Sequence, residues 1–344
     1  MKIGYVYDPI YLQHDTGYHS ENAARLTAIL SYLEKTGLLA ELQLIKPRPA
    51  TIDEIAAVHD RQYISYLAYV AQKGGAWLEV DTVMSPKSYD AAIYAAGGTI
   101  SAVDEVMQDK VSSAFALVRP PGHHATFDRA MGFCIFNNIA VAAKYALAQY
   151  KLERIAIIDF DVHHGNGTQD AFENDPHVLY VSTHQYPHYP GTGHAEDSGI
   201  SQGQGTVLNV PMPAASGDRE YHMVFERIIM PVVRRYRPQL VMVSAGYDIH
   251  WSDELAQMQV TTSGIAGIVS SIKQLADESC HGKIVIALEG GYNLEALSTS
   301  VKATFDVLMG KSDIEDIMGY PKRRASNPNV LPLIKQLAEI HHLA

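Results

Sequence analysis

The chain has 344 residues, of which 47% are hydrophobic, and it carries a formal net charge of −11 at pH 7. This size suffices for one large hydrophobic core, while the acidic charge argues against general binding to nucleic acid. No apolar run approaches the roughly 18 residues that signal a membrane-spanning helix, so no membrane partner is expected. The opening residues contain no apolar core of about seven residues, so no signal peptide is expected, and the two cysteines fit a reducing, cytoplasmic compartment.

Short apolar segments alternate with amphipathic segments along the chain. The pattern first predicts a strand at 2–7, a helix at 21–35, a helix opened by a capping box at 51–54, and a helix at 89–107. It then predicts a strand at 114–118, a helix at 137–150, strands at 155–160 and 178–182, a helix at 221–236, a strand at 240–244, a helix at 264–277, a strand at 283–288 and a helix at 294–309. The alternation is typical of an α/β fold in which helices cover both faces of a parallel sheet, and we expect a single domain over 1–344.

Two segments carry no clear helix or strand pattern. The stretch 183–218 is long and rich in glycine and proline, which predicts an ordered functional loop. The tail at 310–344 is polar, and we expect it to pack on the surface of the domain.

The strand at 155–160 ends in a group of metal-ligand residues. Asp159, Asp161 and His163 alternate along the chain, and a period of two places such side chains on one side of an extended segment. Gly165 and Gly167 follow and allow the backbone to turn closely around a bound group. Carboxylate and imidazole at this spacing can chelate a divalent ion, and zinc accepts both. The alternative is a strand end with solvated polar residues.

Five predicted strands carry polar motifs at their carboxyl ends. In an open α/β sheet this edge is where binding and catalytic sites form. The motifs are Arg119-Pro-Pro-Gly-His-His124, Asp159-Phe-Asp-Val-His-His-Gly165, Ser182-Thr-His184, Ala245-Gly-Tyr-Asp248 and Glu289-Gly-Gly-Tyr-Asn293.

These motifs, with Gly132-Phe-Cys134 and Tyr189-Pro-Gly-Thr-Gly193, resemble those of the zinc-dependent histone deacetylase family. That family includes bacterial acetylpolyamine amidohydrolases and acetoin-utilisation proteins. The resemblance runs in order through residues 1–310, and the form of the central motif with Asn166 is similar to the class II branch. It implies the arginase–deacetylase fold, a parallel eight-stranded sheet with helices on both faces.

The resemblance assigns a zinc ion to Asp161, His163 and Asp248. Three protein ligands of this type leave one coordination position open, as catalytic zinc sites do. By the same resemblance, the ion would activate a water molecule and polarise the acyl carbonyl.

The resemblance also implies a set of acid–base residues. His124 would transfer protons, His123 would support it electrostatically, and Asp159 and Asn166 would orient these two rings. Tyr292 would donate a hydrogen bond to the oxyanion of the tetrahedral intermediate. A buried histidine pair and a packed aromatic side chain are the structural alternatives.

The family's substrate channel maps onto five positions. Phe133, preceded by Gly132, and Tyr189 match the two aromatic walls that enclose the acyl-lysine stem. Leu255 matches an aliphatic residue of the rim, and Asp81 matches the rim acid that receives substrate backbone amides.

A monovalent cation, usually potassium, lies beside the zinc in the family. The residues of this chain that match the cation site are Asp159, Asp161, His163, Ser182 and Thr183. They would offer backbone carbonyl and side-chain oxygens, which suit such a hard cation.

Several residues are left with structural interpretations. Arg25 matches an arginine near the family's acetate exit, but it can equally serve to bond loop carbonyls. His184, His188 and His194 are expected to pack within their loop or to face solvent. Cys134 is expected to line the floor of the pocket without acting as a nucleophile.

These features predict a zinc-dependent amidohydrolase that removes acetyl or other acyl groups from lysine side chains or small amines. Its partners would be acylated lysine peptides or acetylated small amines, and an oligomer is compatible with the sequence. The alternatives are an acetylpolyamine amidohydrolase, a manganese ureohydrolase of the same fold and a non-catalytic acyl-lysine binder. An apolar rim at Leu255, with Glu254 adjacent to it, favours acyl-lysine over acetylpolyamines.

Overall fold

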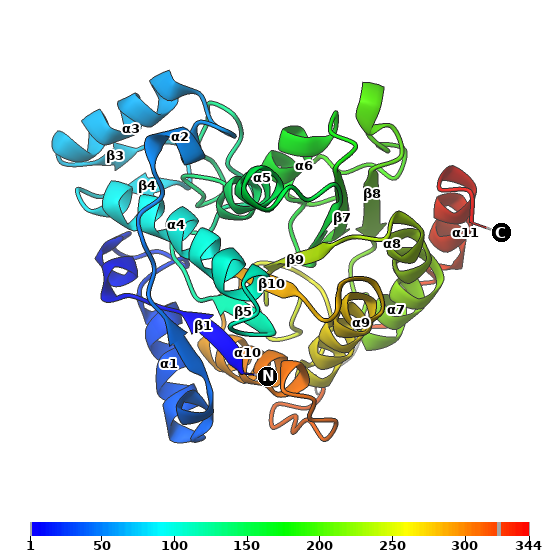
Figure 1. Cartoon of the computed structure of the whole chain (residues 1–344). Coiled ribbons are helices and arrows are strands. Elements are labelled where there is room, and N and C mark those ends of the chain that lie inside the picture. The colour runs from blue at the N-terminus through cyan, green and yellow to red at the C-terminus, as the bar shows by residue number, and fades with distance from the viewer. Residues whose placement is uncertain (1, 322–324, 344) are drawn as a thin grey trace.

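A computed structural model describes residues 2–321 and 325–343 of the chain. Its centre is an eight-stranded, fully parallel sheet in the order β2-β1-β5-β10-β9-β6-β7-β8 (Figure 1). The strands are β1 (Ile3–Val6), β2 (Gln43–Ile45), β5 (Ser113–Ala116), β6 (Ile155–Asp159), β7 (Val178–Gln185), β8 (Val207–Met212), β9 (Leu240–Ala245) and β10 (Ile284–Leu288). A short antiparallel hairpin, β3 (Ala76–Trp77) and β4 (Val83–Met84), lies outside this sheet.

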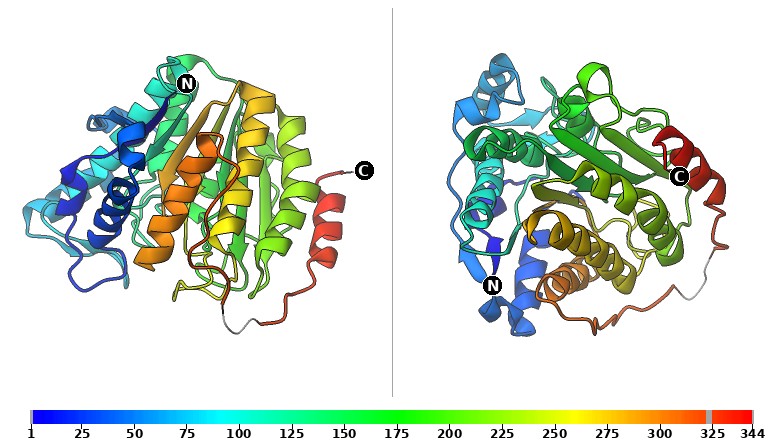
Figure 2. Two further views of the ribbon diagram at one scale, coloured as in Figure 1. Left: turned by 90° about the horizontal axis from the view of Figure 1, so that it is seen from below. Right: turned by 45° about the vertical axis from the view of Figure 1, so that its right-hand side comes forward.

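Helices cover both faces of the sheet, as Figures 1 and 2 show. One layer holds α1 (Ala24–Lys35), α10 (Leu294–Leu308), α9 (Thr262–Cys280), α7 (Asp218–Val224) and α8 (Met230–Tyr236). The other side holds α4 (Ser88–Met107), α5 (Asn138–Tyr150), α6 (Asn166–Phe172), α2 (Ile52–Ile55) and α3 (Arg61–Gln72). Short turns of other helix types lie at Pro9–Gln13, Leu38–Glu41, Ser201–Gly203 and Phe225–Ile229, and α11 (Leu331–Ile340) lies near the C-terminus.

The central strands are apolar runs because both of their faces are covered. Every residue of β5, β6, β9 and β10 is buried. A parallel strand between two helix layers meets no water on either side, so it loses the alternation of an exposed strand. The predicted arginase–deacetylase fold, with a parallel eight-stranded sheet and helices on both faces, is confirmed.

The structure corrects the prediction for the stretch 183–218. Strand β7 continues to Gln185, and the edge strand β8 lies within the supposed loop and pairs with β7. Glycine and proline on both sides of β8 hid its apolar run. The strands β2, β3 and β4 were also missed, because each has only two or three residues.

The helix boundaries show two further differences. The helix predicted at 221–236 is divided by a π-helical turn, Phe225–Ile229, between α7 and α8. The tail, predicted only to pack on the surface of the domain, contains α11, whose Ile334 and Leu337 are buried. The capping box at Thr51 and Glu54 is present as predicted, with hydrogen bonds in both directions.

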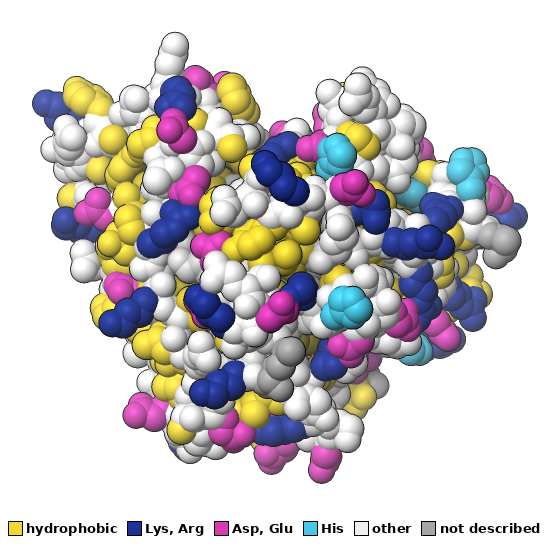
Figure 3. Space-filling view, viewed as in Figure 1, with side chains coloured by type: hydrophobic (Ala, Val, Ile, Leu, Met, Phe, Trp, Pro, Cys, Tyr) yellow, Lys and Arg dark blue, Asp and Glu magenta, His cyan; other side chains and the backbone are white. Residues whose placement is uncertain are grey.

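The surface mixes charges of both signs. On the face shown in Figure 3, basic and acidic side chains lie interspersed over most of the area. Within residues 2–321 and 325–343, no helix is long and apolar enough to cross a membrane.

Candidate active site

The polar motifs that follow β5, β6, β9 and β10 meet at one edge of the sheet, because these strands are parallel neighbours. A cavity of about 250 Å³ opens there. Every residue that the sequence assigned to the substrate channel lines it. The lining consists of Asp81, Pro121, His123, His124, Gly132, Phe133, His163, His188, Tyr189, Leu255, Gly290 and Tyr292.

Asp161, His163 and Asp248 bring their ligand atoms together beside this cavity. His163 Nδ1 lies 3.1 Å from Asp161 Oδ1 and 3.4 Å from Asp248 Oδ2. Ligands bound to one zinc ion lie roughly 3.3 Å apart, so this spacing matches a shared ion. Backbone N–H groups hold both carboxylates, since His163 and Gly290 donate to Asp161 and Val162 donates to Asp248.

Two further features of this cluster fit a bound cation. Asp248 Oδ2 is buried and accepts no hydrogen bond, which is costly unless a ligand satisfies it. Gly246 and Gly290 leave space that any side chain would fill. A Cβ at Gly246 would lie 2.1 Å from Asp161 Oδ2, and one at Gly290 would lie 2.0 Å from Asp248 Oδ2. Three N/O donors with an open side are typical of a catalytic metal site.

The two carboxylates repel each other in the absence of a cation. Burial and the charge of Asp161 raise the pKa of Asp248 to about 7. Burial also acts to raise the pKa of Asp161, but His123 and His163 outweigh it and hold that pKa below its usual value. A divalent cation would relieve the repulsion and keep both groups ionised.

Gly290→Ala is expected to weaken metal retention by a factor of about ten or more, because the new Cβ would overlap the Asp248 carboxylate. Competition with a chelator measures the affinity. The matched control is Gly267→Ala on an exposed position of α9, where a Cβ meets no atom within 4 Å. This control should keep the metal and gain about 0.5–1 kcal/mol of stability. Equal affinities in the two variants would contradict the close contact at Gly290.

The tandem histidines lie side by side, with ring centroids 4.1 Å apart. His123 Nδ1 is 3.0 Å from Asp159 Oδ2, and His124 Nδ1 is 2.9 Å from Asn166 Oδ1. Both partners are acceptors in this arrangement, so each Nδ1 carries a proton and each Nε2 remains for other partners. His123 Nε2 lies 3.8 Å from Asp161 Oδ1. The structure therefore contains both predicted pairings, Asp159 with His123 and Asn166 with His124.

The two histidines differ in their electrostatic environment. Burial lowers the pKa of His123, but Asp159 and Asp161 outweigh it and raise the pKa to about 10. A divalent cation beside His123 would oppose this rise. Burial and the neighbouring His123 and His163 hold the pKa of His124 well below its usual value. Of the two rings, His124 is therefore the one that favours the neutral state.

Glycines allow the close packing around this pair. A Cβ at Gly165 would lie 2.3 Å from Asp159 Oδ2, which accounts for the predicted close turn after the central motif. Gly132 has a φ of +55°, and a Cβ there would lie 2.3 Å from His124 Cδ2. A side chain at either position would displace the hydrogen-bonded rings.

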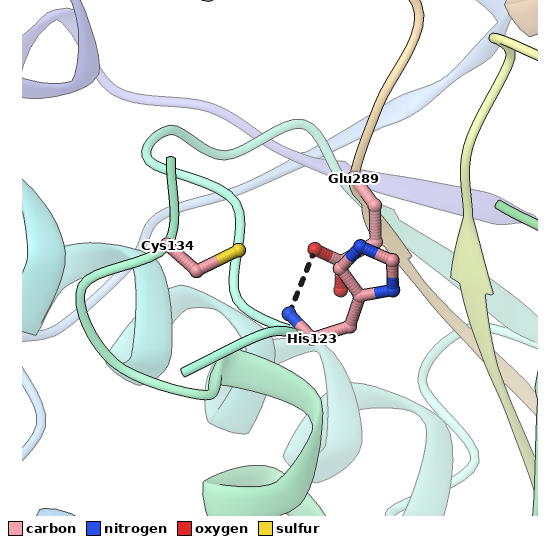
Figure 4. Close-up of side chains that lie close together, drawn as sticks. All are labelled: His123, Cys134 and Glu289. Carbon is pink, nitrogen blue, oxygen red and sulfur yellow. Dashed lines mark hydrogen bonds between the residues drawn. The ribbon is translucent and has the colours of Figure 1, made fainter. Parts of the chain in front are cut away.

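Glu289 lies directly behind His123, as Figure 4 shows. Its Oε2 accepts hydrogen bonds from the N–H groups of Gly122 (2.7 Å) and His123 (3.2 Å), and its Oε1 accepts one from Ser244. Burial raises the pKa of Glu289 to about 7, although His123 acts in the other direction. The sequence analysis included Glu289 in a strand-end motif but gave it no role, because its partner loop is 167 residues away along the chain.

Cys134 points toward His123 and Glu289 (Figure 4). It is fully buried, and its Sγ donates to the carbonyl of Gly132. Burial and the charge of Glu289 hold the pKa of the thiol well above its usual value. The thiol therefore stays protonated, which agrees with the prediction that it is no nucleophile.

Tyr292 lines the cavity beside Phe133, with ring centroids 5.7 Å apart in an edge-to-face arrangement. Burial holds the pKa of the phenol well above its usual value, although Arg25 opposes the rise. The Arg25 guanidinium lies 5.0 Å from the centroid of the Tyr292 ring. Arg25 also donates to the carbonyls of Gly291 (2.7 Å) and Glu289 (2.5 Å), which matches the alternative in which it bonds loop carbonyls.

Tyr189 and Phe133 both line the cavity. The Tyr189 ring lies 5.2 Å from that of His124 in an edge-to-face arrangement. Phe133 is held by a hydrogen bond from its N–H to Thr82 Oγ1. Asp81 lies in the hairpin between β3 and β4 and lines the cavity.

His188 was wrongly placed among the loop-packing or solvent-facing histidines. It lines the cavity and stacks on His163, with ring centroids 5.1 Å apart and an angle of 18° between the planes. Its Nε2 is 3.0 Å from the carbonyl oxygen of Leu255, so it ties one wall to the rim. His184 does pack inside its segment, bonded to Ser182 and Gly193.

Three of the five residues assigned to a monovalent cation lie on adjacent strands. Asp159 and Ser182 are register partners of β6 and β7, and Thr183 follows Ser182. All three are fully buried, and Thr183 Oγ1 makes no hydrogen bond.

Comparison with known proteins gives consistent findings. A family model described as "Histone deacetylase domain" matches residues 19–308. Histone deacetylase 14, chloroplastic, of Arabidopsis thaliana is 41% identical, covering 96% of this chain and 83% of that protein. A probable deacetylase of Archaeoglobus fulgidus is 40% identical (86% and 82% covered), and a histone deacetylase-like amidohydrolase of Pseudomonas aeruginosa is 38% identical (80% and 73%). The crystal structure of the HDA15 HD domain is similar with a TM-score of 0.90 and 34% identity, covering 99% of this chain and 94% of that one.

Proposed function

The chain belongs to the histone deacetylase family, and from this premise we propose that it is a zinc-dependent amidohydrolase that removes acetyl groups from lysine side chains. The observation that carries the proposal is the meeting of three groups at one cavity. They are the metal-ligand cluster, the tandem histidines and Tyr292. A protein that only binds acyl-lysine has no use for this combination.

Asp161, His163 and Asp248 would hold the zinc ion. When bound, zinc lowers the pKa of a water molecule and polarises a carbonyl group. A potassium ion near Asp159 and Ser182 is proposed as well, supported by the pairing of these buried oxygen donors across β6 and β7.

His124 is the proposed general base. Its Nδ1–H donates to Asn166, which leaves Nε2 with a lone pair that can accept a proton from the attacking water. The same nitrogen can then pass the proton to the leaving amine. Because burial and two neighbouring histidines disfavour its charged form, His124 is neutral and ready to accept.

His123 and Tyr292 would act on the negative charge that develops on the acyl oxygen. His123 is held by Asp159, whose carboxylate favours the charged ring while a bound divalent cation opposes it, and His123 would support the developing charge electrostatically. The Tyr292 phenol stays protonated because of its raised pKa, and it can donate a hydrogen bond to that oxygen.

The channel suits the acyl-lysine stem. Phe133 and Tyr189 offer aromatic surface to a chain of four methylene groups, which lysine readily buries. Asp81 at the mouth offers a carboxylate to the peptide N–H groups of a substrate.

A second candidate, hydrolysis of acetylated polyamines, is favoured by one observation. A larger hollow of about 520 Å³ adjoins the channel and shares Tyr292 and Leu255 with it. Glu254 and Glu295 line this hollow and would attract a distal ammonium group. Glu254 and Glu295 do not line the channel itself, so we rank this candidate second.

The experiment compares kcat/KM for an acetyl-lysine peptide, a longer acyl-lysine peptide, acetylputrescine and acetylspermidine, with metal content measured by elemental analysis. We expect stoichiometric zinc and the highest kcat/KM for acyl-lysine peptides. A hundredfold advantage for a polyamine would favour the second candidate, with Glu254→Gln as the variant to lose it. Binding of the peptide without any turnover would indicate a non-catalytic binder, and two manganese ions would indicate a ureohydrolase.

A further inference from the structure

Asp253 has no role in the proposed reaction, yet its carboxylate is hydrogen-bonded directly to the backbone of Tyr292. Oδ2 accepts hydrogen bonds from the N–H groups of Tyr292 (2.6 Å) and Asn293 (3.0 Å). Oδ1 accepts one from the N–H group of Leu255 (3.1 Å). The side chain is buried, with 6% of its surface exposed. One carboxylate thus joins the tyrosine segment to the rim of the channel.

The Tyr292 segment is held from two sides by opposite charges. On one side the Arg25 guanidinium donates to the carbonyls of Glu289 and Gly291. On the other side the Asp253 carboxylate accepts from the two N–H groups that follow. Gly291, which lies between these two contacts, has a φ of +114°, a backbone conformation that glycine adopts readily and residues with a side chain rarely do.

Asp253 is itself positioned by the loop that follows the proposed zinc ligand Asp248. Its N–H donates to the carbonyl of His250, which lies two residues after Asp248. Asn293 reinforces the contact, because its Nδ2 donates to the carbonyl of Ser252. The loop that carries one proposed zinc ligand is therefore joined to the loop that carries the oxyanion donor.

We propose that Asp253 is a positioning residue that sets the place of Tyr292 relative to the metal-ligand cluster. The proposal deepens the proposed function and rests on it. A hydroxyl group stabilises an oxyanion only at hydrogen-bond distance, and a displacement of about 1 Å can cost about a hundredfold in rate. Without this anionic acceptor, the N–H groups of Tyr292 and Asn293 would lose their partner, and the Arg25 contacts and the Asn293–Ser252 bond would remain.

The test is a double-mutant cycle with Asp253→Asn and Tyr292→Phe in the zinc-loaded enzyme. Asn keeps the size of Asp but turns one acceptor oxygen into a donor that faces backbone N–H groups. We expect Asp253→Asn to lower kcat by a factor of about ten or more with KM changed less than about threefold. In the Tyr292→Phe background, the same substitution should change kcat by less than about twofold, because the hydroxyl that it positions is gone.

The second readout is amide hydrogen exchange at 292 and 293, which needs no substrate. These amides should exchange faster in Asp253→Asn than in the wild type. If the wild type hydrolyses no acyl substrate, the proposed function fails. Unchanged amide exchange at 292 and 293 in the variant would show, independently of activity, that Asp253 does not hold the Tyr292 segment. If Asp253→Asn does not fold, Asp253→Ser, which retains one acceptor oxygen, replaces it in the cycle.

The matched control is Asp218→Asn. Asp218 is a comparable carboxylate that accepts from the N–H and the hydroxyl of Thr261 at the start of α9, both at 2.8 Å. The Asp218→Asn substitution should leave kcat within about twofold of the wild-type value. An equal loss of kcat from Asp253→Asn in both Tyr292 backgrounds, or a loss no larger than that of Asp218→Asn, would overturn the proposal.

Discussion

Asp248→Asn is expected to abolish zinc retention and hydrolysis together. The substitution keeps the acceptor for the N–H group of Val162 and replaces Oδ2, the oxygen that has no hydrogen-bond partner, by an amide nitrogen that cannot bind a cation. With only Asp161 and His163 left, the site has too few ligands for a stable catalytic zinc. The activity should fall to the level of the uncatalysed reaction.

The Asp248→Asn substitution should also change how zinc affects the stability of the protein. The metal-free variant should lose little stability relative to the metal-free wild type, because the lost repulsion between Asp161 and Asp248 offsets the lost attraction between Asp248 and His163. Added zinc should raise the melting temperature of the wild type and leave that of the variant unchanged. Elemental analysis and thermal unfolding with and without zinc provide both measurements.

The control for a buried aspartate is Asp306→Asn. Asp306 is buried on α10 and pairs with Lys302 and Lys311, outside the cavity lining. This variant can lose stability but should keep zinc and turnover. If Asp248→Asn retained stoichiometric zinc with normal turnover, the proposed ligand set would be wrong.

Tyr292→Phe is expected to lower kcat by roughly 10²–10³, the loss typical of one oxyanion donor. The phenyl ring can keep its edge-to-face contact with Phe133 and its place near Arg25, so KM and zinc content should change little. Steady-state kinetics on an acetyl-lysine peptide, with elemental analysis of the same preparation, separate chemistry from binding.

Tyr247→Phe provides the control for removing a buried hydroxyl near the same loop. Tyr247 packs against Gly291, and its hydroxyl bonds to Thr304 Oγ1 at 2.9 Å, away from the cavity lining. Its loss should cost about 1 kcal/mol of stability and leave kcat within about twofold. An unchanged kcat in Tyr292→Phe would mean that this tyrosine packs against the channel and does not react.

The central strands and the grouping of Asp161 with His163 were predictable because their signals are local. The strand ending at Asp159 is an uninterrupted apolar run, and Asp161 and His163 follow within four residues. Chelation by neighbours in the chain needs no knowledge of distant contacts. Asp248, His123 and Tyr292 were assigned only by resemblance, since nothing in their local sequence shows that they meet.

Local patterns also failed in specific places. The edge strand β8 was read as a loop because its flanking glycines and prolines outweighed its short apolar run. His188 was assigned to the loop because a lone histidine between proline and tyrosine carries no signal of its direction. The strand β8 forms by pairing with β7, and His188 is turned toward the cavity by stacking on His163.

The α/β class, the order of the main elements and the grouping of Asp161 with His163 followed from the sequence. The buried carboxylates behind the histidines and Tyr292 became apparent only in the folded structure. Glu289 holds the backbone of His123, and Asp253 holds that of Tyr292, 39 residues further along the chain. Such contacts depend on the order of the strands in the sheet, which places β10 between β5 and β9, and no local periodicity encodes that order.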